Sequence, residues 1–264
     1  MYIIGLFLAL IVGVSLGLIG SGGSILTAPI LIYIFEFNEK VATAYSLFIV
    51  GFSSLLGSIK NSKKKIINWK IVAVFGIPSF LGVWLVRYFL IPILPETIYV
   101  TSNFDISRRF LILGLFSILM MLASYSMISK NEKVIEIKLD KLKYLFIPLE
   151  GLIIGGFTGL VGAGGGFLII PALILLTNIS FKKAIATSLM IIAIKSLIGF
   201  FLGDAMYLKI DWSFLIVFSA ITSFGVYLGT YINYFFEGKL LKKGFGYFVF
   251  FMACLILIKE LLIK

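Results

Sequence analysis

The chain has 264 residues, of which 61% are hydrophobic and 13% carry a charged side chain. Soluble domains are closer to half apolar and a quarter charged, so the composition excludes an ordinary soluble globular protein. The formal net charge is +11, but the basic residues gather between apolar runs, as in loops held at a cytoplasmic membrane face, and nucleic-acid binding is not expected. One cysteine and no histidine are present, which excludes a disulfide framework and any Cys/His metal site.

Apolar runs recur from one end of the chain to the other. Runs of roughly 18 or more apolar residues are typical of transmembrane helices, because backbone polar groups in lipid must be satisfied within the segment. The connections leave no room for a soluble domain, so the sequence predicts an all-α integral membrane protein with a single transmembrane domain over residues 1–264. The apolar runs are 2–35, 41–59, 71–94, 110–128, 144–177, 184–202, 212–236 and 245–258.

One glycine cluster occurs twice. The segment "GLIGSGGSILTAP" at 17–29 returns as "GLVGAGGGFLIIP" at 159–171, which is 142 positions later. Further matches in the same order pair "KVATAYSL" at 40–47 with "KKAIATSL" at 182–189 and, with one extra residue, "NWK" at 68–70 with "DWS" at 211–213. The chain is therefore predicted to consist of two homologous transmembrane halves, 1–129 and 142–264, joined by a charged linker at 130–141.

The glycine clusters are predicted to break the first helix of each half. Each first run has 34 residues, about 51 Å as one helix, against a hydrocarbon core of about 30 Å. Adjacent glycines disfavour a helix, and broken helices at matching positions of two halves point to a transporter's substrate site. The half-helix after each break offers free N–H groups to an anion. The candidate binding residues are Gly20, Ser21, Gly22, Gly23 and Ser24, and Gly162, Ala163, Gly164, Gly165 and Gly166.

Three other glycine pairs have a spacing of four residues. This small-xxx-small spacing lets helix backbones approach closely in lipid, so these pairs are predicted to pack helices. They are Gly13 with Gly17, Gly155 with Gly159, and Gly225 with Gly229.

Lys195 lies deep inside the apolar run 184–202, and its counterpart in the first half is Ser53. A lysine at the bilayer centre costs about 3 kcal/mol or more, so it should face a cavity or a partner. We expect Lys195 to be the counter-charge of an anionic substrate. Snorkelling or pairing with a buried carboxylate are the alternatives, and the absence of an acidic residue from the same run favours the first reading.

Hydroxyl groups begin the helix that follows each break. They are expected either to donate hydrogen bonds to substrate oxygens or to cap the first turn of their own helix. These residues are Thr43, Tyr45 and Ser46 in the first half, and Thr187 and Ser188 in the second. Arg87, Asp204 and Asp211 lie near the ends of apolar runs and are predicted to be interfacial.

Loop charges favour one orientation of the halves. If each long run crosses once, the basic residues outside the spans divide 13 to 9 between the two sides. If the chain turns back at each glycine cluster, they divide 15 to 7, and the two halves are then inverted repeats. Positive charge gathers on the cytoplasmic side, so the steeper division is favoured, with both termini outside.

The doubled glycine segment, the following "A-x-A-x-S-L"-like stretch and the later "NW" or "DW" resemble the sulfite exporter TauE/SafE family over essentially the whole chain. The resemblance implies a multi-pass transporter in the cell (inner) membrane. An enzyme, a cofactor and a metal are not expected, because the sequence lacks histidine, metal-ligand spacing and an activated nucleophile. Its substrates would be small sulfur-containing or organic anions such as sulfite, sulfonates and sulfoacetate, moved by alternating access. Ser24 departs from the pattern that Gly166 follows.

Two points stay open at this stage. The same glycine breaks could form the filter of an anion channel. The expected partners are the anionic substrate and the lipid bilayer. A homodimer is possible from the sequence but is not decided by it.

Overall fold

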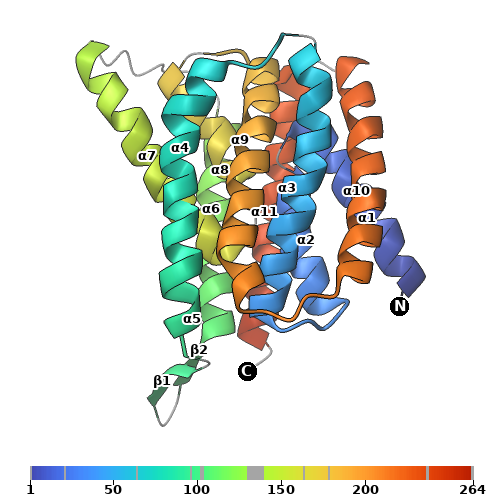
Figure 1. Ribbon diagram of the computed structural model, residues 1–264, viewed down its shortest axis with the longest axis vertical. Coiled ribbons are helices and arrows are strands. Elements are labelled where there is room, and N and C mark those ends of the chain that lie inside the picture. The colour runs from blue at the N-terminus through green and yellow to red at the C-terminus, as the bar shows by residue number, and fades with distance from the viewer. Residues whose placement is uncertain are drawn as a thin grey trace.

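A computed structural model describes residues 2–20, 22–63, 65–95, 97–101, 104–129, 140–162, 164–177, 179–235 and 238–262. The helices form one bundle, with a two-stranded antiparallel hairpin at its lower end in Figure 1, where both chain ends also lie in the lower half. The elements in chain order are α1 (Tyr2–Ile19), α2 (Gly22–Tyr33), α3 (Glu39–Lys63), α4 (Trp69–Leu85), the π-helical turn η1 (Val86–Leu90), α5 (Ile91–Ile93), β1 (Thr97–Thr101), β2 (Phe104–Ser107), α6 (Arg108–Ile128), α7 (Asp140–Val161), α8 (Gly166–Thr177), α9 (Phe181–Leu202), the 3-10 turn η2 (Asp204–Met206), α10 (Trp212–Ile232), the 3-10 turn η3 (Asn233–Phe235) and α11 (Gly238–Leu262).

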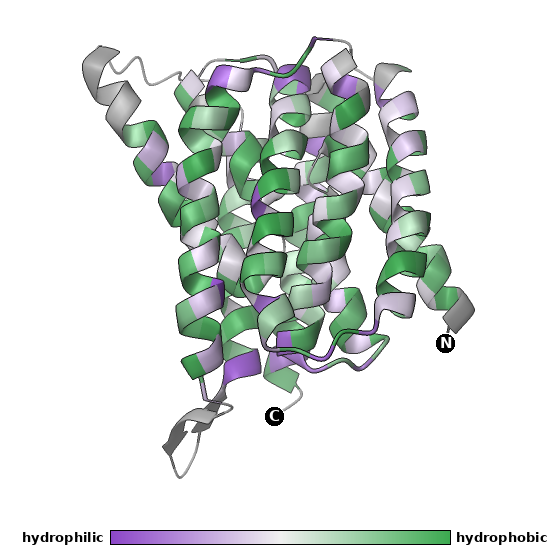
Figure 2. Cartoon of the chain, viewed as in Figure 1, coloured by the Kyte–Doolittle hydropathy of each residue, from purple (hydrophilic) through white to green (hydrophobic). Residues whose placement is uncertain are grey.

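The outside of the bundle is suited to lipid. Large apolar side chains such as Phe7, Leu122 and Phe224 are more than half exposed, and hydrophilic residues concentrate in the loops at both ends of the bundle (Figure 2). The predicted all-α membrane architecture is confirmed, with the β1–β2 hairpin as an addition in the connection after α5. Among the described residues, six segments are long and apolar enough to cross a membrane: Glu39–Ile59, Trp69–Ile93, Arg108–Ile128, Phe181–Met206, Trp212–Ile232 and Lys243–Leu262.

Each 34-residue apolar run contains two helices that meet at its glycine cluster. In the first run α1 ends at Ile19 and α2 begins at Gly22; in the second, α7 ends at Val161 and α8 begins at Gly166. α2 and α8 each have 12 residues, about 18 Å, which is shorter than the hydrocarbon core. The connecting glycines have left-handed backbones that glycine adopts readily. Their φ angles are +74° at Gly20, +73° at Gly162, +61° at Gly164 and +71° at Gly165.

α1 packs against α10 through small residues. A Cβ on Gly13 would lie 2.0 Å from the carbonyl oxygen of Thr222, and one on Gly17 would lie 2.3 Å from that of Val226. Because the contacts advance along both helices together, α1 and α10 run in the same direction. The predicted packing role of this glycine pair is confirmed.

α7 packs against α4 in the same manner. A Cβ on Gly155 would lie 2.1 Å from the carbonyl oxygen of Ser79, and one on Gly159 would lie 2.9 Å from the Cα of Val83. These glycines stand 142 positions after Gly13 and Gly17, and their partners stand 143 positions before those on α10. The contact of α1 with α10 is thus repeated by α7 with α4.

α3 and α9 form the centre of the bundle. In the apolar stretch of each helix, 78% of the residues of α3 and 67% of those of α9 are buried. A Cβ on Gly51 would lie 3.2 Å from the Cβ of Ser196, and the hydroxyl of Ser58 donates to the sulfur of Met190 at 3.8 Å. The contacts advance along α3 while they retreat along α9, so the two helices are antiparallel.

α6 and α11 pack together on another side of the bundle, where Ser124 donates to the carbonyl of Gly246 at 2.8 Å. At one end of this pair, Glu260 accepts hydrogen bonds from Tyr33 at 2.7 Å and from Arg109 at 3.1 Å. This cluster ties α2 to α6 and α11. Most of the predicted linker 130–141 lies outside the described residues.

Candidate functional site

The two glycine loops contact the long helices α3 and α9 reciprocally. A Cβ on Gly20 would lie 2.8 Å from Cγ2 of Ile185, and one on Gly162 would lie 2.4 Å from Cβ of Thr43. Gly20 and Gly162 are 142 positions apart, and so are Thr43 and Ile185. Each loop therefore packs against the second turn of the long helix from the other half of the chain.

The remaining cluster residues lie around the starts of α2 and α8. Gly22 and Gly166 are the first residues of these helices. Gly23 and Ser24 are buried, and a Cβ on Gly23 would lie 2.3 Å from the carbonyl oxygen of Val12, which holds α2 against α1. Two of the predicted binding residues, Ser21 and Ala163, lie outside the described residues.

Lys195 is completely buried beside the second glycine loop. Its Nζ donates a hydrogen bond of 2.7 Å to the hydroxyl of Thr158. A Cβ on Gly165 would lie 3.1 Å from the same Nζ atom, so the ammonium lies close to the glycine loop just before α8. Within the part of the chain that the structure describes, Lys195 belongs to no ion pair.

Buried hydroxyls accompany Lys195 near the crossing of α3 and α9. Ser54 and Ser196, which are 142 positions apart, have side-chain oxygens that are buried without a hydrogen-bond partner among the described residues. Ser53 is completely buried and accepts a hydrogen bond from Ser223 at 3.3 Å. Ser54 and Ser196 are not among the residues predicted from the sequence, although the match of "SSLLG" at 53–57 with "KSLIG" at 195–199 contains the signal.

The other predicted hydroxyls do not cap their own helices. Tyr45 accepts a hydrogen bond of 2.7 Å from the backbone N–H of Asp211, and Thr187 accepts one of 3.2 Å from that of Asn68. Asp211 and Asn68 are themselves the N-caps of α10 and α4. Tyr45 and Thr187 therefore do not cap the first turn of their own helices, which was one of the two alternatives. Each instead supports the start of a helix from the other half.

The three remaining hydroxyls differ in their partners. Thr43 and Ser188 donate to backbone carbonyls three residues earlier, those of Lys40 and Ile185. The hydroxyl of Ser46 is buried without a partner among the described residues. The sequence therefore located these hydroxyls, but it did not separate those with a partner inside the protein from Ser46, which has none among the described residues.

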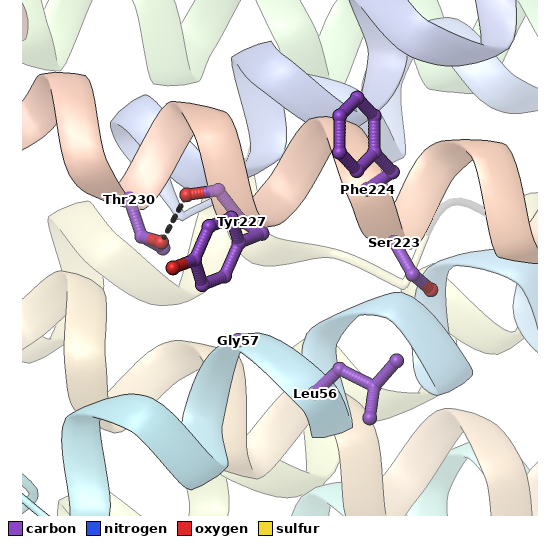
Figure 3. A pocket seen from close by; sticks show the side chains of 6 residues that line it. All are labelled: Leu56, Gly57, Ser223, Phe224, Tyr227 and Thr230. Atoms are coloured by element: carbon purple, nitrogen blue, oxygen red, sulfur yellow. Dashed lines mark hydrogen bonds between the residues drawn. The ribbon is translucent and has the colours of Figure 1, made fainter.

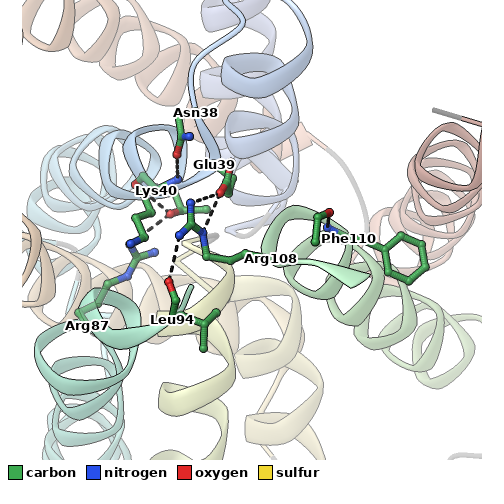
Figure 4. Close-up of polar contacts among 9 residues, drawn as sticks. Asn38, Glu39, Lys40, Arg87, Leu94, Arg108 and Phe110 are labelled. Atoms are coloured by element: carbon green, nitrogen blue, oxygen red, sulfur yellow. Dashed lines mark hydrogen bonds and ion pairs between the residues drawn. The ribbon is translucent and has the colours of Figure 1, made fainter. Parts of the chain in front are cut away.

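Arg87 and Asp204, which the sequence predicts to be interfacial, are buried against other helices. Arg87 is 1% exposed and Asp204 4% exposed. Nη1 of Arg87 donates to Oδ1 of Asp204 at 3.1 Å and to the hydroxyl of Thr43 at 3.2 Å. Figure 4 shows this arginine near a second pair, in which Arg108 binds Glu39 and the carbonyl of Leu94.

A cavity of about 330 Å³ lies between α3 and α10 (Figure 3). Its rim residues Leu56, Phe224 and Tyr227 are well exposed, which is typical of a groove open to lipid. Ser223 lines it and connects it to Ser53 through their hydrogen bond. Among the described residues no group of three or more acidic, histidine or cysteine side chains could hold a metal ion.

The helical bundle, with an apolar exterior suited to lipid and polar and charged side chains at its central helices, is that of a polytopic membrane protein. The chain belongs to the sulfite exporter TauE/SafE family, whose model matches residues 5–256. It is similar to probable membrane transporter proteins of three organisms: 32% identical over 73% of this chain and 70% of the protein from Methanocaldococcus jannaschii, 28% over 92% and 90% from Xylella fastidiosa, and 26% over 88% and 88% from Bacillus subtilis.

No solved structure matches the chain. The family and its relatives are membrane transporters, and the chain is accordingly a multi-pass membrane transporter and not an enzyme.

Proposed function

We propose that this transporter exports small sulfur-containing or organic anions, such as sulfite, sulfonates or sulfoacetate, across the inner (cell) membrane. The observation that carries the proposal is Lys195. Its buried ammonium has a hydroxyl and a glycine loop beside it, and no carboxylate partner among the described residues. A buried cation without an acidic partner favours an anion, because an arriving negative charge compensates its lost hydration.

The groups around Lys195 suit an oxyanion. The start of α8 carries about half a positive charge and N–H groups without an intrahelical partner. The hydroxyl of Ser196, close to Gly164, is buried without a partner among the described residues, and so is that of Ser54 on α3. Gly164 and Gly165 keep side chains out of this space, so an anion can approach the backbone. Several oxygen acceptors on one small anion would use all of these donors together.

The packing supports inverted repeats with alternating access. α3 and α9 occupy equivalent sequence positions and run antiparallel, so an axis that relates the halves would be perpendicular to them and parallel to the membrane. The reciprocal contacts of α1 with α10 and α7 with α4 are those of a two-fold arrangement. Such an axis would cross α3 and α9 near Ser53 and Lys195. The substrate site of an inverted-repeat transporter lies at this depth, with one half moving against the other.

The experiment that tests the proposal is counterflow in proteoliposomes. Vesicles containing the full chain are preloaded with unlabelled sulfite and diluted into radiolabelled sulfite. A transporter gives saturable uptake that internal sulfite stimulates. Uptake that rises linearly with concentration and shows no stimulation would support a channel instead. Absence of any uptake of sulfite, sulfoacetate or other small anions would contradict the proposed substrate class.

A further inference from the structure

Arg87 has more donors than its surroundings use. Its Nη1 bonds to Asp204 and Thr43, but Nε and Nη2 are buried without a partner among the described residues. The second carboxylate oxygen of Asp204, Oδ2, is also unpartnered. An arginine and a carboxylate usually pair through two parallel hydrogen bonds, whereas this pair uses one. A buried donor that is left unsatisfied destabilises the protein, because it has lost its hydrogen bonds to water.

The unused Nε–Nη2 edge is the face of a guanidinium that binds two oxygens of an oxyanion at once. Two backbone features give this edge its position. Arg87 lies in the π-helical turn Val86–Leu90, a distortion that is frequent at functional sites. Gly203 lets α9 approach, since a Cβ there would lie 2.7 Å from Cβ of Arg87.

The second glycine loop connects Arg87 with Lys195. Gly165 lies beside Nζ of Lys195, and three residues earlier Gly162 packs on Thr43, whose hydroxyl accepts from Arg87. The two buried cations therefore lie along one short loop. The position in the second half that is equivalent to Arg87 is Thr230, which carries no charge. The second half therefore has no counterpart of the Arg87 guanidinium, which lies toward the end of the bundle with the β1–β2 hairpin.

We propose that Arg87 is a second oxyanion-binding residue, between Lys195 and the hairpin end of the bundle, and that Asp204 is the internal counter-ion which the anion displaces. This inference rests on the proposed function, because it assigns a second position on the path of the same anion. The anion is a small oxyanion with two oxygens available to the Nε–Nη2 edge. When no anion is present, Asp204 keeps the buried guanidinium from standing unpaired.

Calorimetry on the detergent-solubilised full chain, titrated with sodium sulfite, tests the proposal. Asp204→Asn removes the internal counter-ion, so we expect a second bound sulfite per chain or at least a tenfold tighter apparent affinity. Adding Arg87→Gln to Asp204→Asn should abolish this gain. The double variant leaves two neutral side chains that can bond to each other, so it avoids an unpaired buried charge. Asp211→Asn is the matched control, since Asp211 is exposed at the same end and asparagine can still cap α10.

If Asp204→Asn, with a normal melting curve, binds sulfite like Asp211→Asn, the second site is excluded. The same follows if the double variant keeps the gain, or if chloride produces it as well as sulfite does. These outcomes leave the proposed function intact as long as sulfite binding in the unmodified chain depends on Lys195. If the unmodified chain and Lys195→Met bind sulfite equally well, the result would instead count against the proposed function.

Discussion

The ammonium of Lys195 donates a 2.7 Å hydrogen bond to the hydroxyl of Thr158, and the two residues belong to different helices, α9 and α7. The residues at the equivalent positions of the first half are Ser53 and Leu16. The charge at the centre of the bundle is therefore contributed by one half alone, although the backbone around it is repeated.

Replacing Thr158 by valine should make the protein more dependent on bound anion. The variant removes the one hydroxyl that satisfies Lys195 while keeping the side-chain volume. We expect a lower melting temperature without anion, since losing a partner of a buried charge costs about 1–3 kcal/mol. Sulfite should then raise the melting temperature by more than it does in the unmodified chain.

Thr27→Val is the control for this experiment, because Thr27 is also buried and donates to a carbonyl of its own helix. Its melting temperature should respond to sulfite as the unmodified chain does. Equal responses of both variants would mean that Thr158 has no special relation to the anion.

Gly165→Ala should disrupt the second glycine loop. The backbone at Gly165 has a φ of +71°, which alanine rarely adopts, and the added Cβ would lie 2.0 Å from Cγ2 of Thr158. We expect at least tenfold weaker sulfite binding together with a lower melting temperature. Gly114→Ala is the control, since a Cβ there meets nothing within 4 Å. It should keep its affinity, and normal binding by Gly165→Ala would contradict the assigned site.

The helix end at each glycine cluster could be predicted from the sequence, because it depends on local spacing and backbone preference. A cluster of glycines cannot continue a helix cheaply, wherever the helix lies. The length of each first run then required a second helix after the break. That Lys195 faces a partner inside the protein could also be predicted, because a charged side chain exposed to lipid is costly.

The environment of Arg87 could not be predicted in the same way. Arg87 and Asp204 are 117 positions apart and each lies near the end of an apolar run, which is typical of interfacial residues. Arg87 lies in a π-helical turn and packs closely against Gly203, and neither feature has a periodic signal in the sequence. The hydrogen bonds that Tyr45 and Thr187 accept from Asp211 and Asn68 could not be predicted for a related reason, because each joins residues from opposite halves of the chain.

Cysteine labelling should distinguish inverted from parallel halves. After Cys254→Ser, single cysteines at Asn61 and Lys183 should react with an impermeant maleimide from the same side, and a cysteine at Lys209 from the opposite side. Inverted halves require this pattern, because the loops after α3 and before α9 lie at the same end. Eight simple crossings would put Asn61 and Lys209 on one side and Lys183 on the other, which would contradict the inverted arrangement.

The most direct test of the anion site is the affinity of Lys195 variants for sulfite, measured by calorimetry on the purified full chain with matched melting curves. Two unit charges 4 Å apart interact by about 4 kcal/mol at an effective dielectric constant of 20, and about 1.4 kcal/mol already changes affinity tenfold. We therefore predict that Lys195→Met binds sulfite at least tenfold more weakly. Lys195→Arg, which keeps the charge, should retain part of the affinity, and the exposed control Lys209→Met all of it. Unchanged sulfite affinity in a folded Lys195→Met variant would contradict the account.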